Sequence, residues 1–420
     1  ASRRGVAATL FAALAKASVN IRAIAQGCSE YNITVLIDGS DATKALRAVH
    51  GRFYLDALPL GIGLVGRGLI GSALLQQLEA QRETLLETHR LDVRVLGVAS
   101  SSKMLVDPRG LDLKNWQAAF EADAQPLDLQ AFGLLLAGSG VPNMVVVDCT
   151  ASDEPPAMYA EWMRQGLHVV TPNKRLNSGP LPRHEYIRAR ARESYIHYLY
   201  EATVGAGLPV VATLQHLVAS GDRVRRIEGI FSGTLSFLFN SFAPQQEPFS
   251  AVVAQARANG FTEPDPRDDL GGQDVARKVV ILARECGIDL ELSDVDLVSL
   301  VPEPLRDASA VSPEEFMRRL PEFDSGMAEL AAQAEAQGEC LRFVGVVDVE
   351  QGKGSVELRR YPRQHAFAQL SGSDNIIAFH TARYDQQPLI VRGPGAGAEV
   401  TAGGVFSDLL RLAAYVGAPS

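Results

Sequence analysis

Two ionisable residues one helical turn apart suggest acid–base chemistry in the second half of the chain. Asp274 and Lys278 stand at positions i and i+4 of QDVARKVVILAREC, a segment with the composition of a helix. That spacing places both side chains on one helix face, where the carboxylate can hold the ammonium in position. A lysine held in this way is suited to protonate the oxygen of a carbonyl that is being reduced to an alcohol. A surface ion pair has the same spacing, so the residues alone leave both interpretations open.

Three further stretches gather polar side chains. The strand LHVVTP is followed by Asn173 and Lys174, where an open α/β sheet places its ligands. FSGTLSFLF offers Ser232 and Thr234 in a turn that opens a helix. A Pro- and Gly-rich loop before Asp274 carries the acids Glu263, Asp265, Asp268 and Asp269. The acidic loop suits a cationic ligand group such as an α-amine, although a solvated surface loop would have the same composition.

The segment LGIGLVGRGLIGSALLQQL contains the pattern G-x-G-x-x-G in two overlapping registers. A pyrophosphate site needs a strand before the first glycine and a helix that begins at the third. Only the second register has both, so Gly61 and Gly63 are predicted to be strand residues. The helix N-terminus would offer N–H groups and its dipole to a phosphate. The predicted cofactor loop consists of Gly66, Arg67, Gly68, Leu69, Ile70 and Gly71. The alternative is a glycine-rich turn that only packs the helix on the strand.

The end of the second strand indicates which nucleotide fits. An NAD site usually has Asp or Glu there, but this strand ends VASSSK, with Ser100 and Lys103 and no acid. Together with Arg67, these side chains suit a ribose 2′-phosphate. The sequence therefore favours NADP(H), with NAD(H) and two simply solvated cations as the alternatives.

Composition sets broad limits on the protein. The chain has 420 residues, a net charge of −9 and 46% hydrophobic residues, which is typical of two or three globular domains. No basic block is present, so we expect neither nucleic acid nor an anionic membrane as a partner. Four scattered cysteines without C-x-x-C spacing suggest a reducing compartment. No apolar run is long enough to predict a membrane span.

The elements that must position these residues form three units. Residues 1–55 read as helix, two alternating strands and helix, which predicts an α/β sandwich that lacks its first strand. Residues 56–200, after a short linker at 56–59, alternate apolar strands with helices and predict a parallel sheet of the Rossmann type. Residues 201–395 mix helical segments with alternating strands and predict a second, α+β domain that carries the candidate substrate residues. The segment 396–420, a Gly-marked turn and a helix, is expected to complete the Rossmann domain.

The first residues allow two interpretations. ASRRGVAATLFAALAKAS has an Arg pair, an apolar stretch and a small-residue end, as a secretory signal does. The favoured alternative is an amphipathic helix with Val6, Leu10 and Leu14 on one stripe. The lack of an initiator Met suggests that the chain was cut from something longer.

Several long motifs resemble homoserine dehydrogenase, in family order from about Leu60 to the C-terminus. They are GRGLIG, TPNK, YEATVGAGLPV, FSGTLSFLFN, GFTEPDPRDDLGGQDVARKVVILARE and VTAGGVFSDLL. Residues 1–55 resemble part of the ACT regulatory region of an aspartate kinase. The order of the two resembles the bifunctional aspartokinase–homoserine dehydrogenases. The resemblance implies reversible reduction of L-aspartate 4-semialdehyde to L-homoserine with NAD(P)H, in threonine, methionine and isoleucine biosynthesis.

The resemblance also implies roles for matching residues. Lys278 matches the proposed proton donor, Asp274 its supporting carboxylate, and Lys174 a rival donor near the nicotinamide. The remaining matches are Glu263 and Asp269 for the substrate amine, Thr234 for the substrate, and Thr150 and Gly404 for the cofactor. A monovalent cation, Na⁺ or K⁺, is implied at Glu201 and the carbonyls of Val204, Ala206 and Leu208. Alternatively, Glu201 only caps its loop.

Regulation, assembly and location follow only from the resemblance. ACT regions bind amino-acid effectors, commonly threonine, and Gln26 and Asn32 are candidate contacts. The family implies a homodimer or homotetramer, with the dimer formed through the second domain's sheet. The expected location is the cytoplasm, or the plastid stroma if the parent chain is from a plant.

Two other functions compete with this interpretation. A catalytically dead, amino-acid-binding remnant would not need Lys174, Asp274 and Lys278, all of which are present. Another Rossmann semialdehyde dehydrogenase or reductase would need a nucleophilic cysteine or a His- and Lys-rich loop. Cys149 follows a strand but has no histidine nearby in sequence, so we expect a buried structural thiol.

Overall fold

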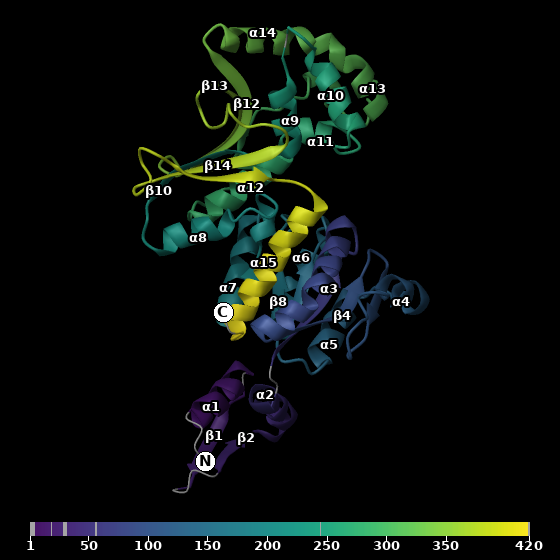
Figure 1. Cartoon of the computed structure of the whole chain (residues 1–420), viewed down its shortest axis with the longest axis vertical. Coiled ribbons are helices and arrows are strands. Elements are labelled where there is room, and N and C mark those ends of the chain that lie inside the picture. The colour runs from purple at the N-terminus through teal and green to yellow at the C-terminus, as the bar shows by residue number, and fades with distance from the viewer. Residues whose placement is uncertain (1–4, 18, 28–31, 55–56, 244, 419–420) are drawn as a thin grey trace.

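The structure, a computed structural model, describes residues 5–17, 19–27, 32–54, 57–243 and 245–418. Cys28, one of the four cysteines, and Asp56 of the predicted linker lie outside these ranges, as do residues 1–4 and 18 of the segment that resembles a secretory signal. Figure 1 shows a small unit at the N-terminus, a central α/β layer and a second sheet at the opposite end. The predicted mixed α/β class, with a parallel Rossmann-type sheet and an α+β region, is confirmed.

The N-terminal unit has the predicted order of elements. It consists of α1 (Val6–Lys16), β1 (Ile21–Gln26), β2 (Ile33–Ile37) and α2 (Ala42–Tyr54). The two strands pair antiparallel, and Leu14, Val19 and Ala45 form its small buried core. The amphipathic helix predicted for the first residues is therefore present as α1.

The central sheet has seven strands in the order β6-β5-β4-β3-β7-β8-β9. They are β3 (Leu58–Val65), β4 (Leu91–Ala99), β5 (Lys103–Val106), β6 (Gln125–Pro126), β7 (Met144–Asp148), β8 (His168–Val170) and β9 (Tyr198–Leu199). Strands β4-β3-β7-β8-β9 are parallel, as predicted, because their near-continuous apolar residues are covered on both faces. The antiparallel edge formed by β5 and β6 was not predicted. The accompanying helices are α3 (Leu69–His89), α4 (Trp116–Asp123), α5 (Leu129–Gly138), α6 (Glu154–Arg164) and α7 (Leu181–Glu193).

The predicted linker at 56–59 is wrong in its second half. Leu58 and Pro59 belong to β3, where they lie opposite Leu91 and Asp92 of β4. Pro59 lacks an N–H, but its carbonyl accepts a hydrogen bond from Asn143 Nδ2 at 3.0 Å. The parallel sheet therefore begins before the apolar run that marked it in the sequence.

The second sheet has six strands in the order β11-β13-β12-β10-β14-β15. Its strands are β10 (Val224–Ile230), β11 (Asp296–Leu297), β12 (Glu339–Asp348), β13 (Lys353–Pro362), β14 (Asp374–Thr381) and β15 (Leu389–Pro394). All neighbours are antiparallel except β11 and β13. The helices of this region are α8 (Val211–Ala219), α9 (Gly233–Ser241), α10 (Phe249–Ala258), α11 (Arg267–Leu270), α12 (Gln273–Glu285), α13 (Pro313–Arg319) and α14 (Asp324–Glu335).

Helix α12 approaches this sheet closely because two strands carry glycine beneath it. A Cβ on Gly345 of β12 or on Gly354 of β13 would lie 2.7 Å from a methyl group of Val279. The close packing buries Val279 and Val280 completely. The helix that carries Asp274 and Lys278 is thus fixed against the sheet.

The C-terminal segment differs from its prediction. Gly403 and Gly404 do not form a turn but lie inside α15 (Ala398–Val416), a continuous helix that packs along α3 (Figure 1). A Cβ on Gly404 would lie 2.7 Å from the carbonyl oxygen of Ala206. The glycine therefore serves close contact between the helix and the 201–208 loop rather than a chain reversal.

Candidate active site

The glycine loop connects β3 to α3 in the second register. Gly66 has φ 94°, which favours glycine, and Gly68 directly precedes the first residue of α3. A Cβ on Gly71 would lie 2.0 Å from the carbonyl oxygen of Gly66, so only glycine fits there. Among the residues that the structure describes, no side chain caps the N-terminus of α3, and a Cβ on Gly68 would meet no atom within 4 Å. An open helix N-terminus of this kind fits a pyrophosphate.

The other two glycines serve the sheet. Gly61 and Gly63 lie within β3, and added Cβ atoms would come within 2.1 Å of Met144 Sδ and 2.2 Å of Leu136 Cδ1. The first register of the pattern is therefore strand packing.

Two of the residues predicted to distinguish NADP from NAD, Ser100 and Lys103, lie in the turn after β4, and the third, Arg67, lies in the glycine loop. Ser100 Oγ accepts the backbone N–H of Lys103 at 2.9 Å in the turn between β4 and β5. The Arg67 guanidinium lies 4.4 Å from the ring centroid of Phe120, and its Nη2 is 2.9 Å from Glu121 Oε1. Glu121, from α4, was not predicted near this position. The preference for NADP remains a prediction.

Three ionisable residues from two elements meet at the predicted catalytic position. Asp274 Oδ2 lies 2.7 Å from Lys278 Nζ, and Asp274 Oδ1 lies 3.2 Å from Lys174 Nζ. The i,i+4 pair predicted on α12 is thus present, and the turn after β8 adds the second lysine. Lys278 also donates to the carbonyl oxygen of Phe231 at 2.7 Å. This carbonyl was not predicted, because Phe231 is apolar and lies 47 residues from Lys278 in the chain.

The surroundings of the cluster shift the pKa of both Lys278 and Asp274 below their usual values. Burial lowers the pKa of Lys278, the Asp274 carboxylate opposes that shift, and Lys174 adds to it. Partial desolvation would raise the pKa of Asp274, whose side chain is still 51% exposed, but the two ammonium groups outweigh it and hold the pKa well below its usual range. Asp274 is therefore a permanent anion between two lysines, one of which holds its proton less tightly than a lysine in water.

The residues predicted to bind the substrate, Glu263 and Asp269 for its amine and Thr234 for another group, lie around the start of α9. Asp269 Oδ2 accepts the backbone N–H of Glu263 at 2.8 Å, and Thr234 Oγ1 donates to the carbonyl of Phe261 at 2.5 Å. Burial raises the pKa of the Asp269 carboxyl. Ser232, the residue after Phe231, caps α9 by accepting from Leu235 N at 3.2 Å, which fixes the start of the helix next to the Phe231 carbonyl. Thr234, Glu263 and Asp269 thus belong to one loop–helix cluster that is tied to Lys278 through Phe231.

The predicted cation ligands lie in the loop from Glu201 to Leu208. The Glu201 carboxylate accepts from Val211 N at 2.7 Å and from Ala212 N at 2.8 Å, so it caps α8. The carbonyl of Leu208 accepts from Val210 N at 2.9 Å. Among the described residues, no group of three or more His, Cys, Asp or Glu could hold a metal. The capping role, given above as the alternative, is therefore present, and the cation remains a prediction.

Residues around the end of β7 complete the site. Thr150 contacts the glycine loop, since a Cβ on Gly66 would lie 2.8 Å from Thr150 Cγ2. Burial raises the pKa of the Cys149 thiol, which argues against a thiolate nucleophile there. Asp148, the fully buried residue before Cys149, was not predicted. A charged residue at the end of the apolar strand MVVVD is the signal that could have identified it.

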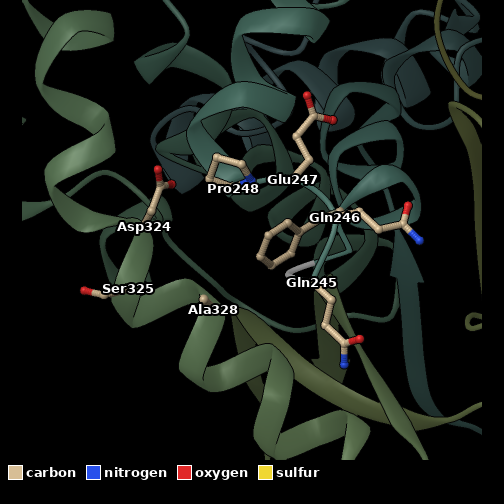
Figure 2. A pocket seen from close by; sticks show the side chains of 8 residues that line it. Gln245, Gln246, Glu247, Pro248, Asp324, Ser325 and Ala328 are labelled. Carbon is tan, nitrogen blue, oxygen red and sulfur yellow. The ribbon is translucent and has the colours of Figure 1, made fainter.

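One surface pocket lies apart from these residues. Figure 2 shows Asp324, Pro248 and Ala328 around it, between α14 and the segment that leads into α10. None of the predicted site residues lines this pocket, and Asp324 already accepts two hydrogen bonds from Ser250. In the part of the chain that the structure describes, no helix is long and apolar enough to cross a membrane.

Comparisons with known proteins agree with this geometry. Residues 209–410 match the homoserine dehydrogenase family, residues 66–201 match the homoserine dehydrogenase NAD-binding domain, and residues 1–53 match an ACT domain. The chain is 58% identical over its full length to 46% of bifunctional aspartokinase/homoserine dehydrogenase 2, chloroplastic, of Zea mays. It is 41% identical to the homoserine dehydrogenase of Schizosaccharomyces pombe, over 85% of this chain and 96% of that protein. A Candida auris protein of unknown function has a similar crystal structure, with TM-score 0.78, 36% identity and coverage of 85% of this chain and 99% of that one. The chain spans about half the length of the bifunctional relatives that it matches.

Proposed function

Because the chain belongs to the homoserine dehydrogenase family, we propose that it interconverts L-aspartate 4-semialdehyde and L-homoserine with a nicotinamide cofactor. The observation that carries the proposal is the cluster of Lys174, Asp274 and Lys278, which joins the cofactor-binding layer to α12. The cofactor, when bound, supplies the hydride in reduction and accepts it in oxidation.

The side chains provide the proton and the charge stabilisation. In reduction, oxygen of the aldehyde gains negative charge, and the Lys278 ammonium stabilises that charge and donates a proton. Asp274 orients the Lys278 ammonium, and the Phe231 carbonyl holds it from another direction. Lys174 contacts the same carboxylate and is the competing donor. No covalent intermediate with the protein is required.

Substrate recognition is assigned to the acidic loop. Asp269 and Glu263 would bind the α-amine of the substrate, and Thr234 a neighbouring polar group. The hydrogen bond from Glu263 N to Asp269 Oδ2 supports this assignment, because it keeps the two residues together. Gly404, against the Ala206 carbonyl, lies where α15 meets the loop of the proposed cation.

The finer cofactor assignments belong to the same proposal. We propose NADP(H) over NAD(H) because Ser100 and Lys103 lie in the turn after β4, Arg67 lies in the glycine loop, and no acid ends that strand. A monovalent cation, Na⁺ or K⁺, would bind the carbonyls of Val204, Ala206 and Leu208 beside Glu201.

The wider context is proposed from the relatives. The ACT match at residues 1–53 supports an amino-acid effector such as threonine, with Gln26 and Asn32 as contacts. Aspartokinase activity belongs to the relatives named for it, and a homodimer or homotetramer is proposed from the family. The plant relatives are named chloroplastic, which favours the plastid stroma over the cytoplasm.

The deciding experiment follows NADPH absorbance with homoserine and NADP. Wild type should turn over, and Lys278→Ala should lose about 10²–10⁴-fold in kcat while it still binds NADP. Lys114→Ala, which removes a largely exposed lysine outside the site, is the matched control and should behave as wild type. Wild type that binds NADP but does not oxidise homoserine would support a regulatory remnant instead.

A further inference from the structure

The carboxylate of Asp148 receives hydrogen bonds from both sides of the proposed active site. Oδ1 accepts from Thr150 N at 2.9 Å and from Thr150 Oγ1 at 2.7 Å. Oδ2 accepts from Tyr159 Oη at 2.6 Å and from Asn173 Nδ2 at 3.0 Å. The side chain is 0% exposed, so each oxygen is fully used within the protein. Four donors therefore satisfy the buried carboxylate, and none of the four belongs to a cationic side chain.

One side of this arrangement is the glycine loop. Thr150 is held by Asp148 through both its N–H and its hydroxyl, and its methyl group faces Gly66. Cys149 N donates to Val65 O at 2.8 Å, at the last residue of β3. A displacement of Thr150 would therefore also move the glycine loop, which is the proposed pyrophosphate site.

The other side is the turn that carries Lys174. The Asn173 amide donates to Asp148 and to Ser152 O at 2.8 Å, while its oxygen accepts from Arg175 N at 2.9 Å. The residue before Lys174 and the residue after it are thus both held by hydrogen bonds of the Asn173 side chain. The main-chain carbonyl of Asp148 accepts Thr171 Oγ1 at 2.8 Å, which fixes the start of the same turn.

We propose that Asp148 is a positioning residue that sets the Lys174 turn and the glycine loop relative to each other. The inference rests on the proposed dehydrogenase function. Asp148 acts through Asn173 and Thr150 and does not touch the reacting atoms. A merely structural acid would stabilise the fold without fixing the lysine relative to the bound cofactor, and a displacement of about 1 Å in such geometry can cost about 100-fold in rate.

The test compares Asp148→Asn with Asp222→Asn. The substituted amide places an NH₂ group against donors on one side, so either Thr150 or the Asn173–Tyr159 pair loses its acceptor. Asp222 is also buried, and its carboxylate accepts Thr381 Oγ1 at 2.7 Å and Arg383 N at 3.2 Å, away from the predicted site residues. It reports the cost of an amide at a buried acid without the positioning role.

Two measurements do not require turnover. NADPH titration by fluorescence should give a Kd about tenfold weaker for Asp148→Asn, and amide hydrogen exchange in 171–178 should accelerate. Asp222→Asn should change neither. Equal Kd values and equal exchange in the two variants would overturn the inference, whether or not wild type oxidises homoserine.

If wild type is active, a double-mutant cycle in kcat tests whether Asp148 acts through Asn173. Asp148→Asn should lower kcat about 100-fold, and the double variant with Asn173→Ala should be no slower than Asp148→Asn. Independent, multiplying losses would contradict action through Asn173. Absence of turnover in wild type would refute the proposed function and leave the binding and exchange results to decide on Asp148.

Discussion

The two lysines of the site are held by different kinds of structure. Lys278 lies on α12 with a side chain 9% exposed, one turn after the carboxylate that binds it. Lys174 lies in the turn after β8 with a side chain 28% exposed, and its neighbours are fixed by Asn173 and Asp148. Helical periodicity therefore places one lysine, and contacts distant in sequence place the other. We infer that catalysis depends more on the position of Lys278 than on the position of Lys174.

The largest difference is expected from arginine substitutions. Lys278→Arg puts a bulky, permanently protonated guanidinium among Asp274, the Phe231 carbonyl and the packed face of α12, so kcat should fall about 10³-fold. Lys174→Arg keeps the charge at a more open position and should cost about tenfold. Steady-state oxidation of homoserine, with NADP binding measured separately, gives both values.

The ranking can fail in a clear way. A larger kcat loss in Lys174→Arg than in Lys278→Arg would make Lys174 the proton donor. Circular dichroism and the melting temperature of each variant are the controls, because Lys278 is buried and its replacement can also affect the fold.

The same contrast explains what the sequence predicted. The i,i+4 pair on α12 and the second glycine register were predictable because both depend on local spacing. The Phe231 carbonyl and Glu121 were missed because their partners lie 47 and 54 residues away in the chain. Asp148 was missed although it is a charged residue at the end of an apolar strand, because its bond to Asn173 spans 25 residues.

Local patterns also misled where tertiary packing overrode them. Gly403 and Gly404 predicted a turn, yet both lie inside α15, where Gly404 allows close contact with the Ala206 carbonyl. Pro59 predicted a linker, yet β3 includes it, and its carbonyl accepts a hydrogen bond from the Asn143 side chain. The edge strands β5 and β6 are too short to give a clear alternating pattern.

A second prediction uses pH to separate the roles of the neighbours of Lys278. Burial lowers the pKa of Lys278, Asp274 raises it and Lys174 lowers it further. Reduction needs the protonated lysine, so its rate should fall as pH rises through that lowered pKa. Asp274→Asn should move the fall to lower pH, and Lys174→Met should move it to higher pH.

The measurement is the pH profile of kcat for aspartate semialdehyde reduction in the three proteins. Opposite shifts would confirm that both groups act on one titrating lysine. Shifts of the same sign, or a profile that does not change, would mean that Lys278 is not the group that titrates in turnover. Oxidation of homoserine should give the mirrored result, because the lysine must then accept a proton.

The smallest effect is expected at Glu201, where a helix cap and a proposed cation site coincide. Glu201→Gln keeps the shape of the side chain but loses one of the two oxygens that accept Val211 N and Ala212 N, at a cost of about 1 kcal/mol in unfolding free energy. Ser312→Ala removes the cap of α13, which accepts Glu315 N at 3.2 Å, and should cost a similar amount.

Activity is then titrated with NaCl against choline chloride at constant ionic strength. A carboxylate that also binds the cation predicts a weakened Na⁺ response in Glu201→Gln alone, since Ser312 is remote from the loop of carbonyls. An unchanged response in both variants would leave Glu201 as a cap of α8 and remove it from the cation site.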